Sequence, residues 1–193
     1  ETSVSSSSSA ESLSSDASSI SFFEDGVTGT MTDGRDGQTY KIVKIGKQIW
    51  MAENLNYAYI GVPFENGLIT FDSTSWCYDN DPANCTKYGR LYTWSAAMDS
   101  VGRWSTNGKG CGDETVCSPT YPVRGVCPEG WHLPTELEWG RLFILDGYTS
   151  TAAERLKSAS GWADNGNGSD IYSFAVLPVG IKNPIEGYVG EGF

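Results

Sequence analysis

The stretch CPEGWHLPTELEW, from Cys127 to Trp139, gathers the side chains of this sequence that are best suited to chemistry. It holds the only histidine, His132, together with a cysteine and three glutamates, of which Glu136 and Glu138 follow the histidine. An imidazole can move a proton or bind a metal near neutral pH, and a neighbouring carboxylate could complete a reaction centre. The alternative is that these residues serve the fold alone.

The architectural interpretation is favoured by the residues around the histidine. Residues 128–130, Pro-Glu-Gly, are typical of a turn, and Trp131 and Leu133 are expected to point into the core. Residues 135–138, TELE, match a capping box, in which the first threonine and the last glutamate close the start of a helix. Catalysis would need a nucleophile or second proton carrier within hydrogen-bonding distance of His132. We therefore expect no catalytic residue and no enzyme activity.

Five cysteines in an acidic chain indicate an oxidising compartment and leave one thiol unpaired. Cys77 and Cys85 bracket the turn-rich loop YDNDPAN, and Cys111 and Cys117 bracket GDETV, so each pair can close a short disulfide loop. Cys127 is then the free cysteine, expected to be buried and inert because no electropositive residue flanks it. Other pairings, notably 117–127, stay open. Paired CxxC knuckles are absent from the sequence, so a zinc site is not expected.

Two acidic loops could bind calcium, which prefers six to eight hard oxygen ligands. The better one contains Asp164, Asn165, Asn167 and Asp170 among glycines that let carbonyl groups turn inward. The other is Asp-Asn-Asp at 79–81. The alternative for both is a solvated turn.

Aromatic side chains make up 12% of the residues and offer apolar faces on which sugar rings can stack. Trp76, Tyr78, Trp104 and Tyr121 lie in loop-like stretches and are the candidate ligand-binding residues. The alternative is that each ring fills the core or a loop.

The composition limits the possible partners. A net charge of −11 repels phosphate backbones and anionic lipid, so neither nucleic acid nor a bare membrane is an expected partner. No apolar run approaches the length that spans a bilayer. Residues 1–21 contain 12 serines and are expected to form a flexible tether about 25 Å long, ahead of one domain at 22–193. With no leader before it, the chain is expected to be a mature or trimmed product.

The chemistry-bearing residues must be positioned by a few short elements. Turn residues and alternating polarity predict a β-hairpin, and periodicity and caps predict helices. The expected elements are a hairpin of 40–45 and 48–51, helices at 91–98, from 135 and at 152–158, a long ordered loop at 99–126 and a buried strand at 173–179.

Four collinear motifs within residues 30–185 resemble the Fibrobacter succinogenes major paralogous domain. They are DGQTYKIVKIGKQIWMAENLNY, SWCYDNDPANCTKYGRLYTWSAAM, YPVRGVCPEGWHLPTELEW and LKSASGWADNGNGSDIYSFAVLPVG. Members of this family are typically secreted or lipid-anchored bacterial surface proteins without an established activity. The family usually continues into further strands, so the resemblance implies that this chain either is truncated at GYVGEGF or belongs to a paralogue that has lost those strands. In both cases a sheet edge is left that a partner strand could cover.

The segment WHLPTELEW is also similar to one motif of the formylglycine-generating-enzyme group. That similarity implies an α+β, C-type-lectin-like fold with two to three short helices, small twisted antiparallel sheets and long ordered loops. The enzymes' catalytic cysteines lie downstream of this motif, whereas no cysteine follows Cys127 here.

Together these observations favour a non-catalytic extracellular module for adhesion or ligand binding, with a polysaccharide as ligand. We expect it to be secreted or anchored at the bacterial outer membrane or cell surface, without inserting into the membrane itself. The alternative is a structural component of a cell-envelope or extracellular complex, held by protein–protein contacts that include self-association.

Overall fold

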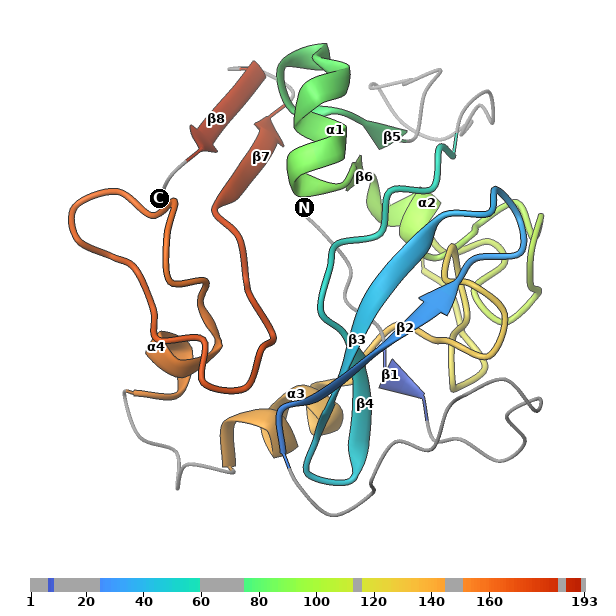
Figure 1. Cartoon of the computed structure of the whole chain (residues 1–193). Coiled ribbons are helices and arrows are strands. Elements are labelled where there is room, and N and C mark those ends of the chain that lie inside the picture. Colours follow the sequence, from blue (N-terminus) through green and yellow to red (C-terminus); the bar gives the residue numbers. More distant parts are fainter. Residues whose placement is uncertain are drawn as a thin grey trace.

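The computed structural model describes residues 7–8, 25–59, 75–112, 116–144, 151–183 and 187–191. In these residues the chain forms an α+β fold of short helices and small antiparallel sheets joined by long loops (Figure 1). The strands are β1 (Ser7–Ser8), β2 (Val27–Thr32), β3 (Thr39–Ile45), β4 (Gln48–Met51), β5 (Ser75–Trp76), β6 (Leu91–Tyr92), β7 (Val179–Asn183) and β8 (Gly187–Glu191). The helices are the 3-10 turn η1 (Tyr78–Asn80), α1 (Pro82–Tyr88), α2 (Trp94–Ala97), α3 (Glu136–Ile144) and α4 (Ala152–Leu156).

The largest sheet has the strand order β1-β4-β3-β2, and every neighbouring pair is antiparallel. The predicted hairpin is confirmed as β3 and β4, with Ile45 opposite Gln48 across a two-residue turn. Gly46 supplies the positive φ of 59° that such a turn requires. Along β3, the side chains of Tyr40 and Ile42 are buried, whereas those of Thr39 and Lys41 are exposed.

The expected tether lies largely outside the described residues, so its flexibility stays a prediction. Within it, Ser7 and Ser8 form β1 and pair with Trp50 and Ile49 of β4.

Helix α3 begins as predicted. The Glu138 amide donates to the Thr135 hydroxyl at 3.2 Å, and the Thr135 amide donates to the Glu138 carboxylate at 2.8 Å, which completes the capping box. The helix packs on the sheet through the ring of Trp139, 5.0 Å from that of Trp50 in β4. Phe174 contacts both tryptophans, at 5.8 and 6.3 Å between ring centroids, so it anchors the segment 170–177 to the same core.

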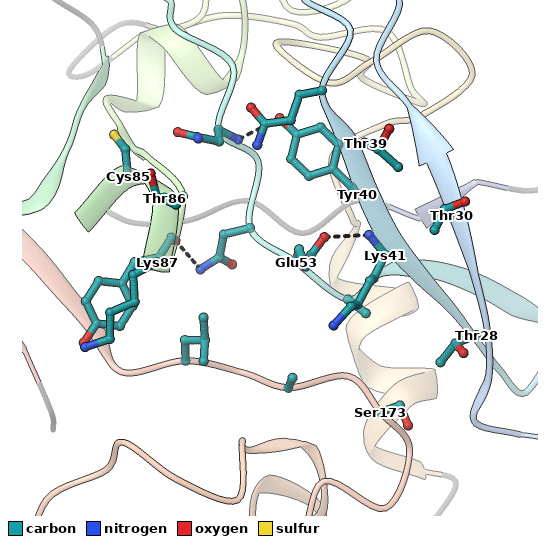
Figure 2. Close-up of a pocket in the computed structure, with 18 of the residues that line it drawn as sticks. Thr28, Thr30, Thr39, Tyr40, Lys41, Glu53, Cys85, Thr86, Lys87 and Ser173 are labelled. Carbon is teal, nitrogen blue, oxygen red and sulfur yellow. Dashed lines mark hydrogen bonds between the residues drawn. The ribbon is translucent and has the colours of Figure 1, made fainter. Parts of the chain in front are cut away.

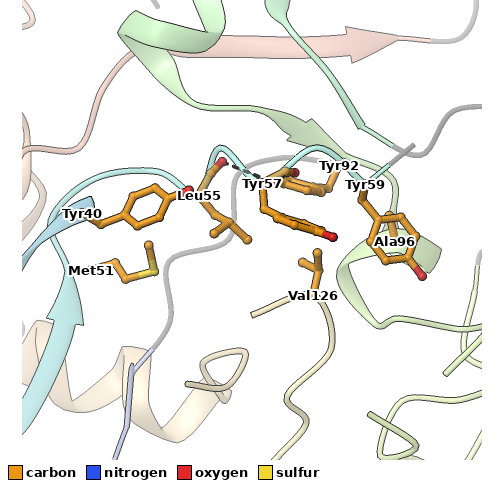
Figure 3. Packing of buried hydrophobic residues seen from close by; sticks show 8 residues of the cluster. All are labelled: Tyr40, Met51, Leu55, Tyr57, Tyr59, Tyr92, Ala96 and Val126. Carbon is orange, nitrogen blue, oxygen red and sulfur yellow. Dashed lines mark hydrogen bonds between the residues drawn. The ribbon is translucent and has the colours of Figure 1, made fainter. Parts of the chain in front are cut away.

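A second part of the core consists mainly of tyrosines (Figure 3). Tyr59 is 1% exposed and its hydroxyl donates to Asp99 at 2.6 Å. The Tyr92 hydroxyl donates to the Tyr57 carbonyl at 2.7 Å, and its burial raises its pKa. Because the hydroxyls of Tyr59 and Tyr92 both have a partner, these two rings can fill the interior without leaving their polar atoms unsatisfied.

Three expectations about elements need correction. The Cys77–Cys85 loop is not only a turn, because α1 forms inside it, with Asp81 as N-cap and Pro82 in the first turn. The helix expected at 91–98 is limited to α2, since Leu91 and Tyr92 pair with β5 instead.

The buried strand expected at 173–179 is wrong. Ser173 and Ala175 adopt φ of 56° and 54°, a left-handed conformation that interrupts a strand. Only a bridge from Val176 to Lys157 and the start of β7 at Val179 remain.

Candidate functional site

An open groove of about 780 Å³ crosses the exposed face of β2 and β3 (Figure 2). We call it the β2–β3 groove. Its volume lies within the range of about 300–1,000 Å³ that is typical of small-ligand sites. Three further segments line it, namely 52–56, the end of α1 at 85–89, and 170–177.

Threonines dominate the strand side of the groove. Thr28 and Thr30 stand on the exposed face of β2, and Thr39 and Lys41 stand beside them on β3. The register places Thr30 opposite Lys41. In Figure 2 the Lys41 side chain extends from β3 towards the segment 170–177.

The segment 52–56 is held between the sheet and α1 by specific hydrogen bonds. The Asn54 side-chain amide donates to the Tyr88 carbonyl at 2.9 Å, and the Arg90 amide donates to the Leu55 carbonyl at 3.0 Å. Gly89 permits this approach, because a Cβ there would lie 2.7 Å from Cβ of Asn54. The two sides of the groove are therefore fixed relative to each other.

The aromatic rings in the groove wall are closed to a ligand. Tyr40 is 1% exposed and Tyr88 is 6% exposed. Burial raises the pKa of Tyr40 to about 12, so its hydroxyl stays neutral and accepts a bond from the Asn56 amide at 3.0 Å. The side chains of the groove that are left to form hydrogen bonds are therefore mainly those of threonine, serine and amide residues.

Both carboxylates of the groove are engaged by backbone amides. Glu53 accepts from the Lys41 amide at 2.6 Å, and Asp170 accepts from the Ala175 amide at 2.8 Å. Two lysines, Lys41 and Lys87, balance these two charges formally. The groove is therefore polar and formally neutral, in a protein of net charge −11.

The sequence's most reactive-looking stretch lies elsewhere. His132 is 8% exposed, and its Nε2 lies 2.9 Å from Oε1 of Glu138. Burial alone would raise the pKa of Glu138, but hydrogen bonds from Thr135 and His132 outweigh it and lower that pKa. His132 thus donates to the carboxylate that caps α3, and Leu133 beside it is buried. This geometry agrees with the architectural interpretation.

Both disulfides favoured by the spacing are present. Cys77 is bonded to Cys85, and Cys111 to Cys117. Cys127 takes part in neither disulfide and is 1% exposed, in the same core cluster as Cys111.

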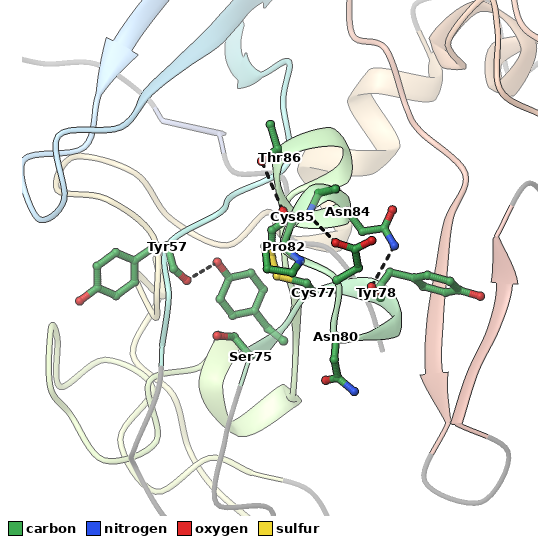
Figure 4. The surroundings of a disulfide bond; sticks show 12 residues. Tyr57, Ser75, Cys77, Tyr78, Asn80, Pro82, Asn84, Cys85 and Thr86 are labelled. Atoms are coloured by element: carbon green, nitrogen blue, oxygen red, sulfur yellow. Dashed lines mark hydrogen bonds between the residues drawn. A yellow bond between two sulfur atoms is a disulfide. The ribbon is translucent and has the colours of Figure 1, made fainter.

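The four candidate aromatic residues do not form one platform. Trp76 and Tyr78 lie near the β7–β8 hairpin, where Lys182 Nζ is 3.9 Å above the Trp76 ring and Tyr188 is 5.2 Å from Tyr78. Figure 4 shows the Tyr78 ring pointing away from the disulfide towards β7, and it is 7% exposed, so it offers no open face.

The other two aromatics are in different surroundings. Trp104 is half-buried, packs edge-on against Tyr57 and lies 5.2 Å from the guanidinium of Arg35. Tyr121 is 69% exposed and is the most accessible of the four candidates.

The aspartates and asparagines of the candidate calcium loop are explained by the backbone conformation and hydrogen bonds of the loop itself. Asp164, Asn165 and Asp170 have φ of 51°, 59° and 48°, which aspartate and asparagine tolerate better than most residues. Asn167 accepts from the Trp162 amide at 3.0 Å, and the Asp170 side chain bonds Ala175. The calcium site stays a prediction.

Polar side chains of the other candidate calcium loop, 79–81, also form hydrogen bonds within the protein. Asp81 accepts from the Ala83 amide at 2.9 Å, and Asn80 accepts from the Tyr188 hydroxyl at 2.7 Å. Across the described ranges, no three histidine, cysteine, aspartate or glutamate side chains are grouped so that they could hold a metal ion.

Sequence reasoning missed the residues of the groove, among them Thr28, Thr30, Lys41, Glu53 and Ser173. A partial signal was available, because VTGTMT alternates threonine with other residues directly before the predicted hairpin. No local pattern indicated that the segment 170–177 would lie across from this strand.

The fold and the groove define a small, disulfide-bonded α+β domain with an open polar groove on one face of its largest sheet. A family model described as Fibrobacter succinogenes major domain matches residues 43–189, and the chain belongs to that family. No curated protein and no solved structure is significantly similar to it.

Within the described ranges, none of the helices is long and apolar enough to cross a membrane. Two disulfide bonds are typical of secreted or exported proteins.

Proposed function

We propose that this protein is a non-catalytic binding module of the cell exterior, and that the β2–β3 groove holds a polysaccharide chain. The observation that carries this proposal is the groove lining: hydroxyl and amide side chains around a formally neutral, open trough. An uncharged polyhydroxylated chain can exchange hydrogen bonds with such groups without leaving a buried charge unpaired.

The same lining argues against catalysis. General acid–base chemistry needs a group that can exchange a proton with the substrate. Glu53 and Asp170 already accept bonds from backbone amides, and the only histidine is buried at the start of α3. We therefore assign the groove to binding alone.

The remaining parts of the proposal rest on resemblance. The C-type-lectin-like architecture is supported by the combination of short helices, small antiparallel sheets and long loops. Residues 1–21, apart from Ser7 and Ser8 that pair with β4, serve as the tether to a bacterial cell surface or outer membrane, which is supported by their serine content and by the family's usual context.

An assembly role in a cell-envelope or extracellular complex is the second candidate function. One specific observation favours it: among the described residues, no strand pairs with the outer edge of β2.

A glycan array followed by pull-down on insoluble polysaccharides tests the binding function. Replacing Thr28 and Thr30 by valine removes two hydroxyls and keeps the shape of the strand. At about 0.7 kcal/mol for each lost hydrogen bond, affinity is expected to fall about tenfold. Thr106→Val is the matched control, because Thr106 is exposed and does not line the groove.

Failure to retain any polysaccharide would remove the proposal. Equal retention by the double variant and the control would place binding outside the groove.

A further inference from the structure

β2 is the last strand of its sheet, and in the part of the chain that the structure describes no strand pairs with its outer side. The register fixes which peptide groups face that side. The Asp33 amide donates to the Gln38 carbonyl at 2.8 Å, and hydrogen-bonded pairs alternate along an antiparallel ladder. The odd-numbered residues of β2 therefore bond to β3, whereas Thr28, Thr30 and Thr32 direct their N–H and C=O groups outwards.

As far as the described residues go, this edge lacks the features that usually prevent pairing. Edge strands are commonly short, charged, interrupted by proline or covered. The strand VTGTMT has six residues, no charge and no proline, and its three threonines are exposed. Its outward peptide groups form a row that another strand can bond.

We infer that two copies of this protein pair through β2, antiparallel and around a twofold axis at Thr30. The sequence T-x-T-x-T is symmetric about this residue, so the strand is complementary to itself. Thr30 then faces Thr30 of the second copy, and Thr28 faces Thr32. Every outward N–H meets a carbonyl, and each threonine has a threonine opposite it on the same face, a favourable cross-strand pair.

The charge distribution supports a second copy as the occupant. Two molecules of net charge −11 repel each other, and an uncharged strip is where they can approach at the lowest cost. On this face, Thr30 lies directly opposite a charged residue of β3, Lys41. In the pair, the two copies of Lys41 would be three strand spacings apart, about 14 Å, which exceeds the Debye length of about 8 Å at physiological salt.

The pairing does not depend on the proposed binding function. It joins the two four-stranded sheets into one and places both grooves on the same face. If the groove binds polysaccharide, one chain could engage both copies, and avidity would exceed the affinity of a single groove.

Sedimentation velocity of the full chain across micromolar to millimolar concentration tests the pairing. The wild type is expected to shift from monomer to dimer as concentration rises. Thr32→Pro is expected to stay monomeric, because proline removes an outward N–H and leaves the β2–β3 ladder intact. The control Thr32→Val keeps that N–H and is expected to dimerise. Neither variant alters a residue that lines the groove, so a failure of pairing is distinguishable from a failure of glycan binding.

Disulfide trapping tests the register. Opposed residues of a hydrogen-bonded pair have Cα atoms about 5.5 Å apart, a spacing that a disulfide can bridge. Under mild oxidation, Thr30→Cys is expected to form a covalent dimer. Thr28→Cys alone is not expected to do so, whereas a mixture of Thr28→Cys and Thr32→Cys is expected to form a mixed dimer. A wild type that is monomeric at every concentration, or a Thr28→Cys variant that links as readily as Thr30→Cys, would overturn the inference.

Discussion

Asp99 provides the sharpest test of how the loop after α2 is held. Its side chain is fully buried, at 0% exposed. One carboxylate oxygen accepts from the Tyr59 hydroxyl at 2.6 Å and the Arg103 amide at 2.9 Å. The other accepts from the amides of Trp104 at 2.5 Å and Ser105 at 2.9 Å. A single carboxylate therefore ties the tyrosine core to the start of the long loop.

The change Asp99→Asn keeps the shape but not this pattern. An amide has one acceptor oxygen and an NH2 group with two donors. In the more favourable orientation of the new amide side chain, its oxygen still accepts from the Trp104 and Ser105 amides. The Tyr59 hydroxyl then rotates and accepts a hydrogen bond from the NH2 group. The Arg103 amide is then left facing a donor.

The expected loss follows from these bonds. A bond to a charged group contributes about 1.5–3 kcal/mol net, and an unsatisfied buried donor costs about 1–3 kcal/mol. We expect Asp99→Asn to lower the free energy of unfolding by about 3 kcal/mol and the Tm by about 10 °C. Asp99→Ala removes the acceptor of all four donors, and we expect it to cost about 5 kcal/mol.

Urea denaturation followed by near-ultraviolet circular dichroism measures these losses. Asp164→Asn is the matched control, because Asp164 is exposed and loses the same charge; its change is expected to stay within about 0.5 kcal/mol. An Asp99→Asn variant that is as stable as this control would refute the assigned hydrogen bonds.

Three further predictions concern the helix cap at Glu138, the close packing at Gly125 and the Cys77–Cys85 disulfide. Because the pKa of Glu138 is lower in the folded protein than in an unfolded chain, its stabilisation is complete above the unfolded pKa of about 4.3 and is lost as pH falls through the folded pKa. Acid titrations are therefore expected to show a smaller loss of stability for Glu138→Gln than for wild type, and identical acid slopes would contradict this. Gly125→Ala would place a Cβ against a backbone carbonyl at a φ of 55° and is expected to cost more than about 2 kcal/mol in urea denaturation, whereas Gly34→Ala, with open space around it, is expected to be tolerated. The double change of Cys77 and Cys85 to serine is expected to lower the free energy of unfolding by about 2.5 kcal/mol on the chain-entropy model, and a loss near zero would show that the loop needs no covalent closure.

Local signals predicted the local structure well. The hairpin of β3 and β4 followed from alternation and the Gly46-Lys47 turn, and the start of α3 followed from its capping box. Asp81 and Pro82 carried a comparable start signal for α1, but the many turn residues around it concealed that helix. Each successful prediction depended on residues fewer than about ten positions apart, the range over which turns and caps act.

The groove could not be predicted in this way. It brings β2 together with segments that lie far along the chain, and what holds the segment 170–177 there is Phe174, packed on Trp50 and Trp139. The apolar run at 173–179 was predicted to be a strand because hydrophobic residues indicate burial, and short buried segments are often strands. The left-handed backbone at Ser173 and Ala175 is a tertiary outcome that hydrophobicity does not encode.

Whether the β2–β3 groove is the ligand site can be measured by backbone amide chemical-shift mapping during titration with a polysaccharide fragment that the protein retains. We expect the perturbed amides to cluster at Thr28, Thr30, Lys41 and the segments 52–56 and 170–177. Perturbations that cluster around Tyr121 instead, with the groove amides unchanged, would contradict it.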